Sequence, residues 1–587
     1  MGDQSTFDFF RQETSHKDVV IRTDAMNKLA LVCTVMTPEK VRGDMIPYLI
    51  SKMDDMDQVL LAMAKRLGEV VTSCGGIEHA ACLLGVLEPL CAIEETVVRT
   101  AASTSISTIL KQFNDCSSGS SSAAAAYVAM FKKIAAIPDA ECSFYCKVSA
   151  AQMADQMYRV SSAEDRGPVQ EVYFALCKDE MPIVRRAAAS TFSKIAPLVD
   201  KSAQAGEFLQ ILKSLSAPEE HPTVKILAAE CYIDFIQLLN HNEQAETAYE
   251  DLINFVKNSV DDHSWRIRLA VVENFGALAV CFSPEVVSAE IFHCFTTLLQ
   301  DSEAEVRGGI CTSAIAFLEI VGPEQFLNDV VPIAGVLATD LTPSVRKALA
   351  DMCVDVAASL GPDTPNISFS DLVVKLLGDE DASVRLRVLQ KLGLIAEKVP
   401  NLLERITPQL VTMYSDENWR VRRQLNLEMP AVMKHMHQEY FQSHFLETYV
   451  ASLKDSVCEV RNAMAFSLCA LVQVSDSNWV QDKIYPTIKS LTAEEYFSRI
   501  TMISALKHLL DGGVAERFLN EIYALVMTSA SDTVPNVRLA TANVIADICR
   551  RDGASSIIGE LRPVLKELKD DKDKDVRYIA AEALKLI

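Results

Sequence analysis

The stretch DLTPSVRKALADMCVDV, residues 340–356, contains the pattern on which the fold depends. An acidic residue opens it, a proline follows, and an aliphatic and a basic residue stand side by side at Val345 and Arg346. Apolar residues then recur three and four positions apart as far as Val356, which is the spacing of one buried helix face. The stretch therefore predicts a short turn followed by an amphipathic helix.

The same acidic turn, aliphatic residue and basic residue recur along almost the whole chain. From position 185 onward the basic residue, called the marker here, returns every 37 to 43 residues. A second apolar segment precedes each turn, so every copy predicts two helices rather than the four strands of a WD40 blade. The markers are Arg22, Leu60 (where leucine replaces the basic residue), Arg99, Lys147, Arg185, Lys225, Arg268, Arg307, Arg346, Arg385, Arg422, Arg461, Arg499, Arg538 and Arg577.

This period and helix pairing indicate HEAT repeats. The sequence predicts an all-α solenoid of about 15 repeats, continuous over residues 1–587, in place of the four domains that length alone suggests. Two segments interrupt the pattern. Asn114–Ala126 is either a flexible joint or the frayed start of a helix, and Gly361–Ser370 is expected to be a longer loop between helices.

The residues of the turn have physical roles. Asp and Ser suit the start of the second helix as caps, and Pro fits its first turn. The marker arginine lies beside the buried stripe and can reach the acidic turn of a neighbouring repeat, which predicts a ladder of Asp–Arg contacts along the chain. Exposed pairs contribute about 0–1 kcal/mol each, so stability is expected to come mainly from apolar faces stacked between neighbouring repeats.

Composition narrows the possible functions. The net charge of −23 opposes nucleic-acid binding, and 49% hydrophobic residues argue against disorder. No apolar stretch is long enough for a membrane span and no secretory signal is visible, so the sixteen cysteines are expected to be reduced thiols in the cytosol or nucleus. Phosphate-binding loops, a dinucleotide fingerprint and HExxH are all missing, so we expect no enzyme, cofactor or metal.

Several turns carry aromatic residues. Trp265 (DDHSWRIR) and Trp419 (DENWRVR) share one register, two residues before the buried aliphatic residue. A large aromatic residue beside an arginine on an exposed turn suits a protein interface, and the alternative is a ring folded back onto its own helix. Trp479 begins a first helix, which favours packing. Tyr496 and Phe497 bring two aromatic residues to another turn.

At these turns the chain resembles the scaffold (A, 65 kDa regulatory) subunits of type 2A serine/threonine protein phosphatase. The resemblance covers essentially the whole chain, although Cys458 and Glu459 depart from the family pattern at the twelfth turn. The matching stretches are EETVVR (94–99), MPIVRRAAAS (181–190), SWRIR (264–268), NWRVR (418–422) and KDVRYIAAEAL (574–584).

The resemblance implies a non-catalytic scaffold that assembles the phosphatase holoenzyme. The repeats of residues 400–587, about the eleventh to fifteenth, would bind the catalytic subunit. The repeats of residues 16–320, about the first to eighth, would bind an interchangeable regulatory B-type subunit. The implied catalytic-subunit contacts are Trp419, Arg420, Tyr496, Arg499, Val534 and Asn536. The implied regulatory-subunit contacts are Glu94, Glu95, Pro182, Arg185, Arg186, Ser264, Trp265 and Arg266.

Two other classes of function remain open from the sequence. One is a HEAT-array adaptor for tubulin or transport cargo, although tubulin-binding arrays come in units of about six repeats. The other is an enzyme on a HEAT scaffold, such as a DNA glycosylase, which would need a basic face that the net charge of −23 opposes.

Overall fold

The computed structural model describes residues 2–115, 122–137, 144–199, 204–239, 243–362, 367–551 and 555–587. In these ranges the backbone forms α-helices with short 3-10 and π-helical turns, and no strand. The all-α class predicted from the sequence is therefore confirmed. The chain divides into two compact units, Met1–Cys294 and Phe295–Ile587, and the boundary falls inside helix α19 (Phe292–Leu298).

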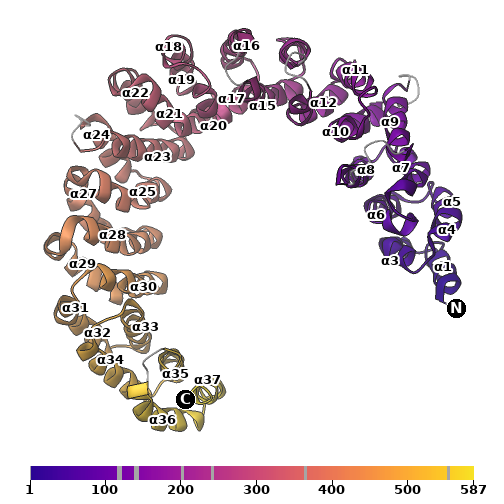
Figure 1. Ribbon diagram of the computed structural model, residues 1–587. Helices are drawn as coiled ribbons and strands as arrows, with labels where there is room; N and C mark the ends of the chain where they lie inside the picture. Colours follow the sequence, from indigo (N-terminus) through magenta and orange to yellow (C-terminus); the bar gives the residue numbers. More distant parts are fainter. Residues whose placement is uncertain are drawn as a thin grey trace. The chain divides into compact units, whose positions relative to one another are not determined.

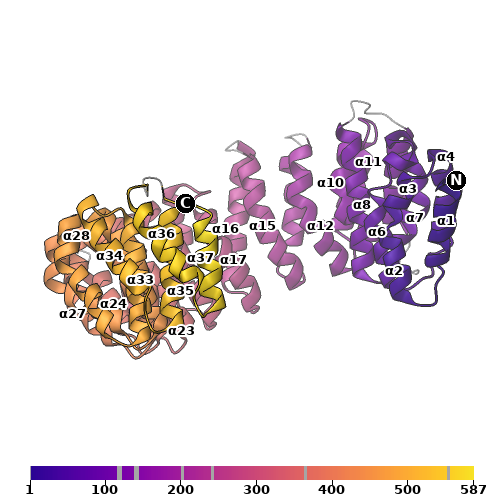
Figure 2. The same cartoon turned by 90° about the horizontal axis from the view of Figure 1, so that it is seen from below.

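In the unit Met1–Cys294 the helices form two rows (Figure 1), and neighbouring helices run side by side (Figure 2). The helices before each turn, called the first row, are α1 (Gly2–Glu13), α4 (Pro38–Lys40), α5 (Ile46–Ile50), α7 (Leu84–Leu90), α9 (Ser122–Ala135), α11 (Arg166–Cys177), α14 (Leu209–Leu215), α16 (Glu243–Val260) and α18 (Pro284–Val286). The helices after each turn, called the second row, are α2 (Val19–Asn27), α3 (Leu29–Thr34), α6 (Asp57–Leu67), α8 (Thr96–Asp115), α10 (Phe144–Val160), α12 (Pro182–Ile195), α15 (Pro222–Leu239) and α17 (Trp265–Ala279).

The unit Phe295–Ile587 has the same two rows. Its first row is α22 (Pro323–Leu337), α24 (Ile367–Leu377), α27 (Pro400–Thr412), α29 (Leu446–Ala451), α31 (Ser477–Lys483), α32 (Tyr485–Ser490), α34 (Glu516–Ser529) and α36 (Ser555–Lys569). Its second row is α20 (Ala304–Ile310), α21 (Ala314–Val321), α23 (Pro343–Leu360), α25 (Ala382–Leu389), α26 (Leu392–Lys398), α28 (Trp419–His444), α30 (Cys458–Val474), α33 (Tyr496–Gly512), α35 (Pro535–Cys549) and α37 (Lys574–Leu584). A kink at His437, with φ of 68°, divides α28 between two successive repeats.

The core lies between the rows and continues from each repeat to the next. In α23, the residues of the predicted stripe, Val345, Leu349, Met352, Cys353 and Val356, are at most 2% exposed. Within each unit, second-row helices pack against neighbouring second-row helices, as α30 does between α28 and α33. No repeat encloses a core alone, so burial of apolar surface depends on stacking, as the sequence predicts.

The starts of the second-row helices differ in one respect from the prediction. Pro182, Pro343 and Pro535 occupy the first helical position, as expected. Asp18, Asp381 and Asp573 cap their helices, as predicted. The aspartate of the ladder, however, stands two residues before the cap. Its carboxylate accepts the backbone N–H of the cap residue, as Asp416 does from Asn418 at 2.8 Å, while Asn418 itself caps the helix.

The predicted ladder of Asp–Arg contacts is present. Arg346 donates from Nε and Nη2 to both carboxylate oxygens of Asp379 in the next repeat, at 2.7 and 2.9 Å. Its Nη1 donates to the backbone carbonyl of Asp340 in its own turn at 2.6 Å. One guanidinium therefore closes its own turn and holds the following one. The equivalent pairs are Arg22–Asp55, Lys147–Asp179, Arg185–Glu220, Lys225–Asp262, Arg307–Asp340, Arg385–Asp416, Arg422–Asp455, Arg499–Asp532 and Arg538–Asp571.

Several ladder carboxylates have a pKa below the ordinary value for aspartate. At Asp571 the hydrogen bond from Arg538 lowers the pKa and outweighs burial, which acts in the opposite direction. At Asp340, Asp455 and Asp532 burial is the largest influence and raises the pKa. The arginine and backbone hydrogen bonds, together with the arginine charge, nevertheless lower it overall.

The two irregular segments are shorter than predicted. The loop prediction for Gly361–Ser370 is wrong at its end, because helix α24 already begins at Ile367; residues 363–366 lie outside the described part of the chain. At Asn114–Ala126, α8 continues to Asp115 and α9 begins at Ser122, whereas residues 116–121 lie outside the described ranges.

Arg346→Ala should destabilise the protein by about 2 kcal/mol, because it removes charged hydrogen bonds and leaves Asp379 unpaired. The side chains of Arg346 and Asp379 are only 6% and 7% exposed. Lys454→Ala is the matched control, since its pair with Glu494 is 46% and 44% exposed and should contribute about 0.5 kcal/mol. Urea unfolding followed by circular dichroism compares the two, and equal losses would contradict a structural role for the ladder.

The ladder also predicts how stability depends on pH. A carboxyl whose pKa is lowered by folding contributes stability that is complete above its unfolded pKa, about 3.9, and is lost as pH falls through the folded value. The stability difference between the wild type and Asp571→Asn should therefore be constant above about pH 5 and shrink below it. Urea midpoints measured across pH test this, and a difference independent of pH would contradict it.

Candidate functional site: the turns between paired helices

Tryptophan and arginine form matched pairs at two turns. Trp265 and Trp419 are the first residues of α17 and α28, and both side chains are half-buried. The guanidinium of Arg266 lies 4.8 Å from the ring centre of Trp265, and that of Arg420 lies 4.6 Å from Trp419. An exposed cation–π contact contributes about 0.5–1 kcal/mol, enough to orient a ring at the surface. Each pair therefore presents an ordered aromatic side chain with a charged edge.

The arginines of these pairs are distinct from the ladder arginines. Arg420 is exposed, whereas Arg422, two positions later, donates to Asp455 and to the carbonyl of Asp416. Arg422 thus stabilises the fold through the ladder, whereas Arg420 faces solvent. The arrangement provides hydrogen-bond donors and an apolar ring for a protein surface, without a nucleophile or a base.

One turn of the unit Phe295–Ile587 replaces the ladder carboxylate with aromatic residues. Ala493 stands where most other turns have an acid, and Arg461 donates from Nε to Thr501 Oγ1 at 3.1 Å instead. The guanidinium also lies 5.0 Å from the ring centre of Phe497. Phe497 and Tyr496 are 40% and 47% exposed and meet edge to face, with ring centres 5.9 Å apart.

A comparable contact between a marker arginine and an aromatic ring occurs in the unit Met1–Cys294. The guanidinium of Arg99 lies 4.5 Å from the ring centre of Tyr145. Tyr145 precedes the marker Lys147 by two positions, as Phe497 precedes Arg499. A buried marker arginine thus has two kinds of partner in the next repeat, a carboxylate or an aromatic ring.

The other predicted contacts fall into two groups. Those at the surface are Glu94, Glu95, Arg186 and Asn536, which are exposed, and Pro182, Ser264 and Val534, which are half-buried. Arg185 and Arg499 belong to the ladder, and their contacts with a partner protein stay a prediction. All three nitrogens of each guanidinium donate within the chain: Arg185 to Glu220 and the carbonyls of its own turn, Arg499 to Asp532 and the carbonyl of Glu494. These hydrogen bonds give both arginines a structural role within the chain.

Some exposed apolar residues were not predicted. Met181 and Ile183 are 40% and 43% exposed on either side of Pro182. Ile183 and Arg186 also line a hollow of about 320 Å³ that involves residues of α8, α10, α12 and α15. Leu341 is 97% exposed, in a turn position where most other repeats have a polar or charged residue. A leucine at this otherwise polar turn position was the feature of the sequence that could have identified the exposed residue.

Trp479 confirms the packing prediction. It is 8% exposed, its Nε1 donates to Gln442 Oε1 at 2.6 Å, and its ring lies 6.2 Å from that of Phe441.

Among the described residues, no three histidine, cysteine or acidic side chains come together as metal ligands. No helix in the described ranges has the length and apolar character needed to cross a bilayer.

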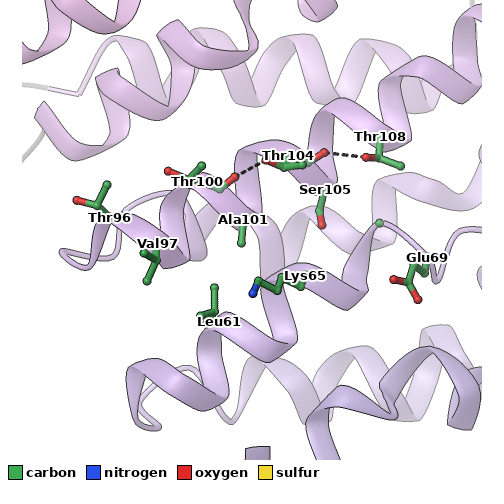
Figure 3. A pocket seen from close by; sticks show the side chains of 11 residues that line it. Leu61, Lys65, Glu69, Thr96, Val97, Thr100, Ala101, Thr104, Ser105 and Thr108 are labelled. Carbon is green, nitrogen blue, oxygen red and sulfur yellow. Dashed lines mark hydrogen bonds between the residues drawn. The ribbon is translucent and has the colours of Figure 1, made fainter. Parts of the chain in front are cut away.

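A second hollow, of about 560 Å³, lies between α6 and α8 (Figure 3). Exposed threonines at positions 96, 100, 104 and 108 follow one side of α8, and Lys65 and Glu69 lie across from them on and just after α6. Thr104 and Thr108 donate to the carbonyls one turn earlier, at 2.7 and 2.9 Å. These two hydroxyls are therefore bonded to the backbone of their own helix.

Comparison with known protein families points to one family. Residues 284–361 match the family model described as PPP2R1A-like HEAT repeat. The chain is 29% identical over 291 residues to the regulatory A subunit of protein phosphatase PP2A from Schizosaccharomyces pombe, covering 47% of this chain and 45% of that one. It is 28% identical over 389 residues to the beta isoform of the 65 kDa regulatory A subunit of serine/threonine-protein phosphatase 2A from Homo sapiens, covering 66% and 62%.

Shorter matches reach higher identity. The alpha isoform of the 65 kDa regulatory A subunit from Arabidopsis thaliana is 34% identical over 190 residues, covering 32% of this chain and 31% of that one. The aligned part thus spans about half or less of most of these curated relatives. The resemblance predicted from the turns is confirmed, and the relatives' names, regulatory subunits rather than catalytic ones, agree with the prediction that this chain is not an enzyme.

Solved structures agree on the fold. The chain matches Kap95p in its complex with RanGDP with a TM-score of 0.63 at 14% identity, covering 100% of this chain and 76% of that one. It matches Kap121p bound to Ste12p with a TM-score of 0.58 at 12% identity, covering 93% and 64%. At such identities the likeness confirms the helical solenoid alone.

Restoring the missing acid should strengthen the ladder. Ala493→Asp places a carboxylate where it can accept from Arg461 and from the N–H of residue 495, so we expect a gain of about 1 kcal/mol. Ala493→Asn is the matched control, with the same shape and no charge. Combining Ala493→Asp with Arg461→Gln should remove the gain, which urea unfolding measures. A destabilised Ala493→Asp would show that the aromatic partner excludes the carboxylate.

Proposed function

Because the chain is a HEAT-repeat protein similar to the regulatory A subunits of phosphatase 2A, we propose that it is the non-catalytic scaffold of a type 2A protein phosphatase. It binds the catalytic subunit with turns of its C-terminal repeats, within residues 400–587. It binds a regulatory B-type subunit with turns of its N-terminal repeats, within residues 16–320.

The observation that carries this proposal is the presence of one ordered tryptophan–arginine pair in each compact unit. Trp265 with Arg266 supports the regulatory-subunit side, and Trp419 with Arg420 supports the catalytic-subunit side. Binding energy in protein interfaces concentrates at tryptophan, tyrosine and arginine, which are the residue types that these turns present. Tyr496 and the apolar Val534 extend the second group along the C-terminal turns.

The mechanism is geometric. A scaffold that holds two proteins at once makes their encounter intramolecular and raises their effective concentration. The ladder fixes each turn against the next, so anchors on successive turns keep their register. We place this activity in the cytosol or nucleus, where thiols remain reduced.

The alternative of a transport adaptor has no specific support, because the likeness to Kap95p and Kap121p is one of fold. A cargo adaptor would need an anchor for its cargo that is independent of the phosphatase. The binding test below separates the two functions.

Trp419→Ala should weaken binding of the type 2A catalytic subunit by about 30-fold, equivalent to about 2 kcal/mol for the loss of an aromatic anchor. Val336→Ala is the control, because Val336 is 71% exposed but lies outside both proposed groups of turn anchors. Trp265→Ala should leave this affinity unchanged and weaken binding of a regulatory subunit. Surface plasmon resonance with the full chain, checked for folding by circular dichroism, measures all three. Unchanged affinity for Trp419→Ala would refute the assignment.

A further inference from the structure

Two hollows of the unit Met1–Cys294 adjoin at the start of α8. The first, of about 560 Å³, lies between α6 and α8, and the second, of about 320 Å³, involves residues of α8, α10, α12 and α15. Thr96, the first residue of α8, lines both hollows. We call them together the long groove, whose lining extends from Leu61 on α6 to Leu227 on α15.

Apolar side chains are exposed in both parts of the long groove. Val97, which lines the first hollow, is 52% exposed, and Ile183, which lines the second, is 43% exposed. Covering such surface with a partner's apolar side chains removes it from water and is favourable. Each hollow can therefore receive an apolar side chain.

Positive side chains without an ion-pair partner accompany these apolar residues. Lys65 in the first hollow and Arg186 in the second are exposed, and within the part of the chain that the structure describes neither forms an ion pair. Figure 3 shows the nitrogen of Lys65 directed toward the side of Val97 and away from Glu69. Glu69, the one acidic residue in the described lining, already pairs with Arg66 at 2.8 Å.

A third positive charge lies beside the second hollow. Arg99 contributes to its lining although the residue is only 2% exposed. Its Nη1 donates to the carbonyls of Ile93 and Glu94 and its Nη2 to Thr96 Oγ1, whereas Nε has no acceptor. In Arg346, by contrast, Nε donates to a carboxylate at 2.7 Å. The described lining of the second hollow thus has two guanidinium groups and no acidic side chain.

We propose that the long groove binds an extended segment of a partner protein in which acidic side chains adjoin apolar ones. One carboxylate pairs with Arg186, close to the charge of Arg99, and another pairs with Lys65. Guanidinium and ammonium groups bind carboxylates through charge-assisted hydrogen bonds. Apolar side chains of the segment cover Val97 and Ile183. A nucleic acid is the less suitable occupant, because the groove is partly apolar and the net charge of −23 repels a polyanion.

The inference goes beyond the proposed function. Among these residues only Arg186 belongs to the turn contacts expected for a regulatory subunit, whereas Lys65, Val97 and Arg99 have no such role. The groove contains neither tryptophan–arginine pair, and binding of an acidic segment does not require a phosphatase. Its failure would therefore leave the role of Trp419 and Trp265 unaffected.

The test selects peptides on the immobilised full chain from a phage library of random short sequences. We expect enriched peptides in which glutamate or aspartate adjoins leucine, isoleucine, valine or phenylalanine. A fluorescein-labelled copy of the most enriched acidic peptide then gives its affinity for the full chain by fluorescence anisotropy. Added salt should weaken this binding, because exposed charges are screened.

Two charge reversals and a matched control make the outcome decisive. Arg186→Glu and Lys65→Glu should each weaken binding of the peptide by about 10-fold, because each places a negative charge opposite a carboxylate. Exchanging the peptide's glutamates for lysines should restore binding to Arg186→Glu. Lys194→Glu is the control, since Lys194 is exposed on α12 and lines neither hollow. Circular dichroism confirms that each variant is folded.

The proposal is overturned if no acidic peptide is enriched. It is equally overturned if every enriched peptide binds both groove variants as tightly as the wild type, or if Lys194→Glu weakens binding as much as the groove variants do.

Discussion

The structure depends on one interaction, the marker arginine that binds two successive turns. Arg346 and its equivalents lie beside the apolar stripe, with a planar group whose donors point in two directions. One of its nitrogens, Nη1, donates to the carbonyl of its own turn, and the other two donate to the carboxylate of the next repeat. That carboxylate in turn accepts a backbone N–H at the start of its own helix, as Asp379 does from Asp381. Stacked repeats share their cores, so a contact that sets the spacing of successive turns also sets the packing.

This constraint leaves certain turn positions free to vary. The acid, the aliphatic residue and the marker have fixed inward roles, whereas the positions between them face outward. Tryptophan and arginine at those positions gain no ladder contact, and their presence at two turns is the observation on which the proposed interface rests. Where the ladder itself changes, at Ala493, aromatic residues both replace the carboxylate and appear at the surface.

Much of the fold could be predicted because the same pattern returns in many repeats, so the clear copies settle the helix assignment of the unclear ones. The stripe beginning at Val345 and the pairing of the markers with the next turn both follow from spacing that returns throughout the chain. Assigning roles to single side chains was harder. Arg185 and Arg499 match the family's turn motifs, yet they are ladder residues, because a linear motif does not distinguish an inward arginine from an outward one.

Features that join residues from separate segments could not be predicted. The hollow between α6 and α8 depends on how two helices pack, which leaves no periodic signal in the sequence. The start of α24 at Ile367 was not predicted, because proline and polar residues suggested a loop as far as Ser370.

The central claim is that the outward residues of the ladder turns bind the phosphatase catalytic subunit. Hydrogen–deuterium exchange of the full chain, with and without that partner, tests it most directly. The account predicts slower exchange at residues 416–422, 493–499 and 532–538, while the turns at 179–185 and 262–268 stay unchanged. Protection spread over the threonine side of α8, or no protection at the C-terminal turns in a complex that has formed, would contradict it.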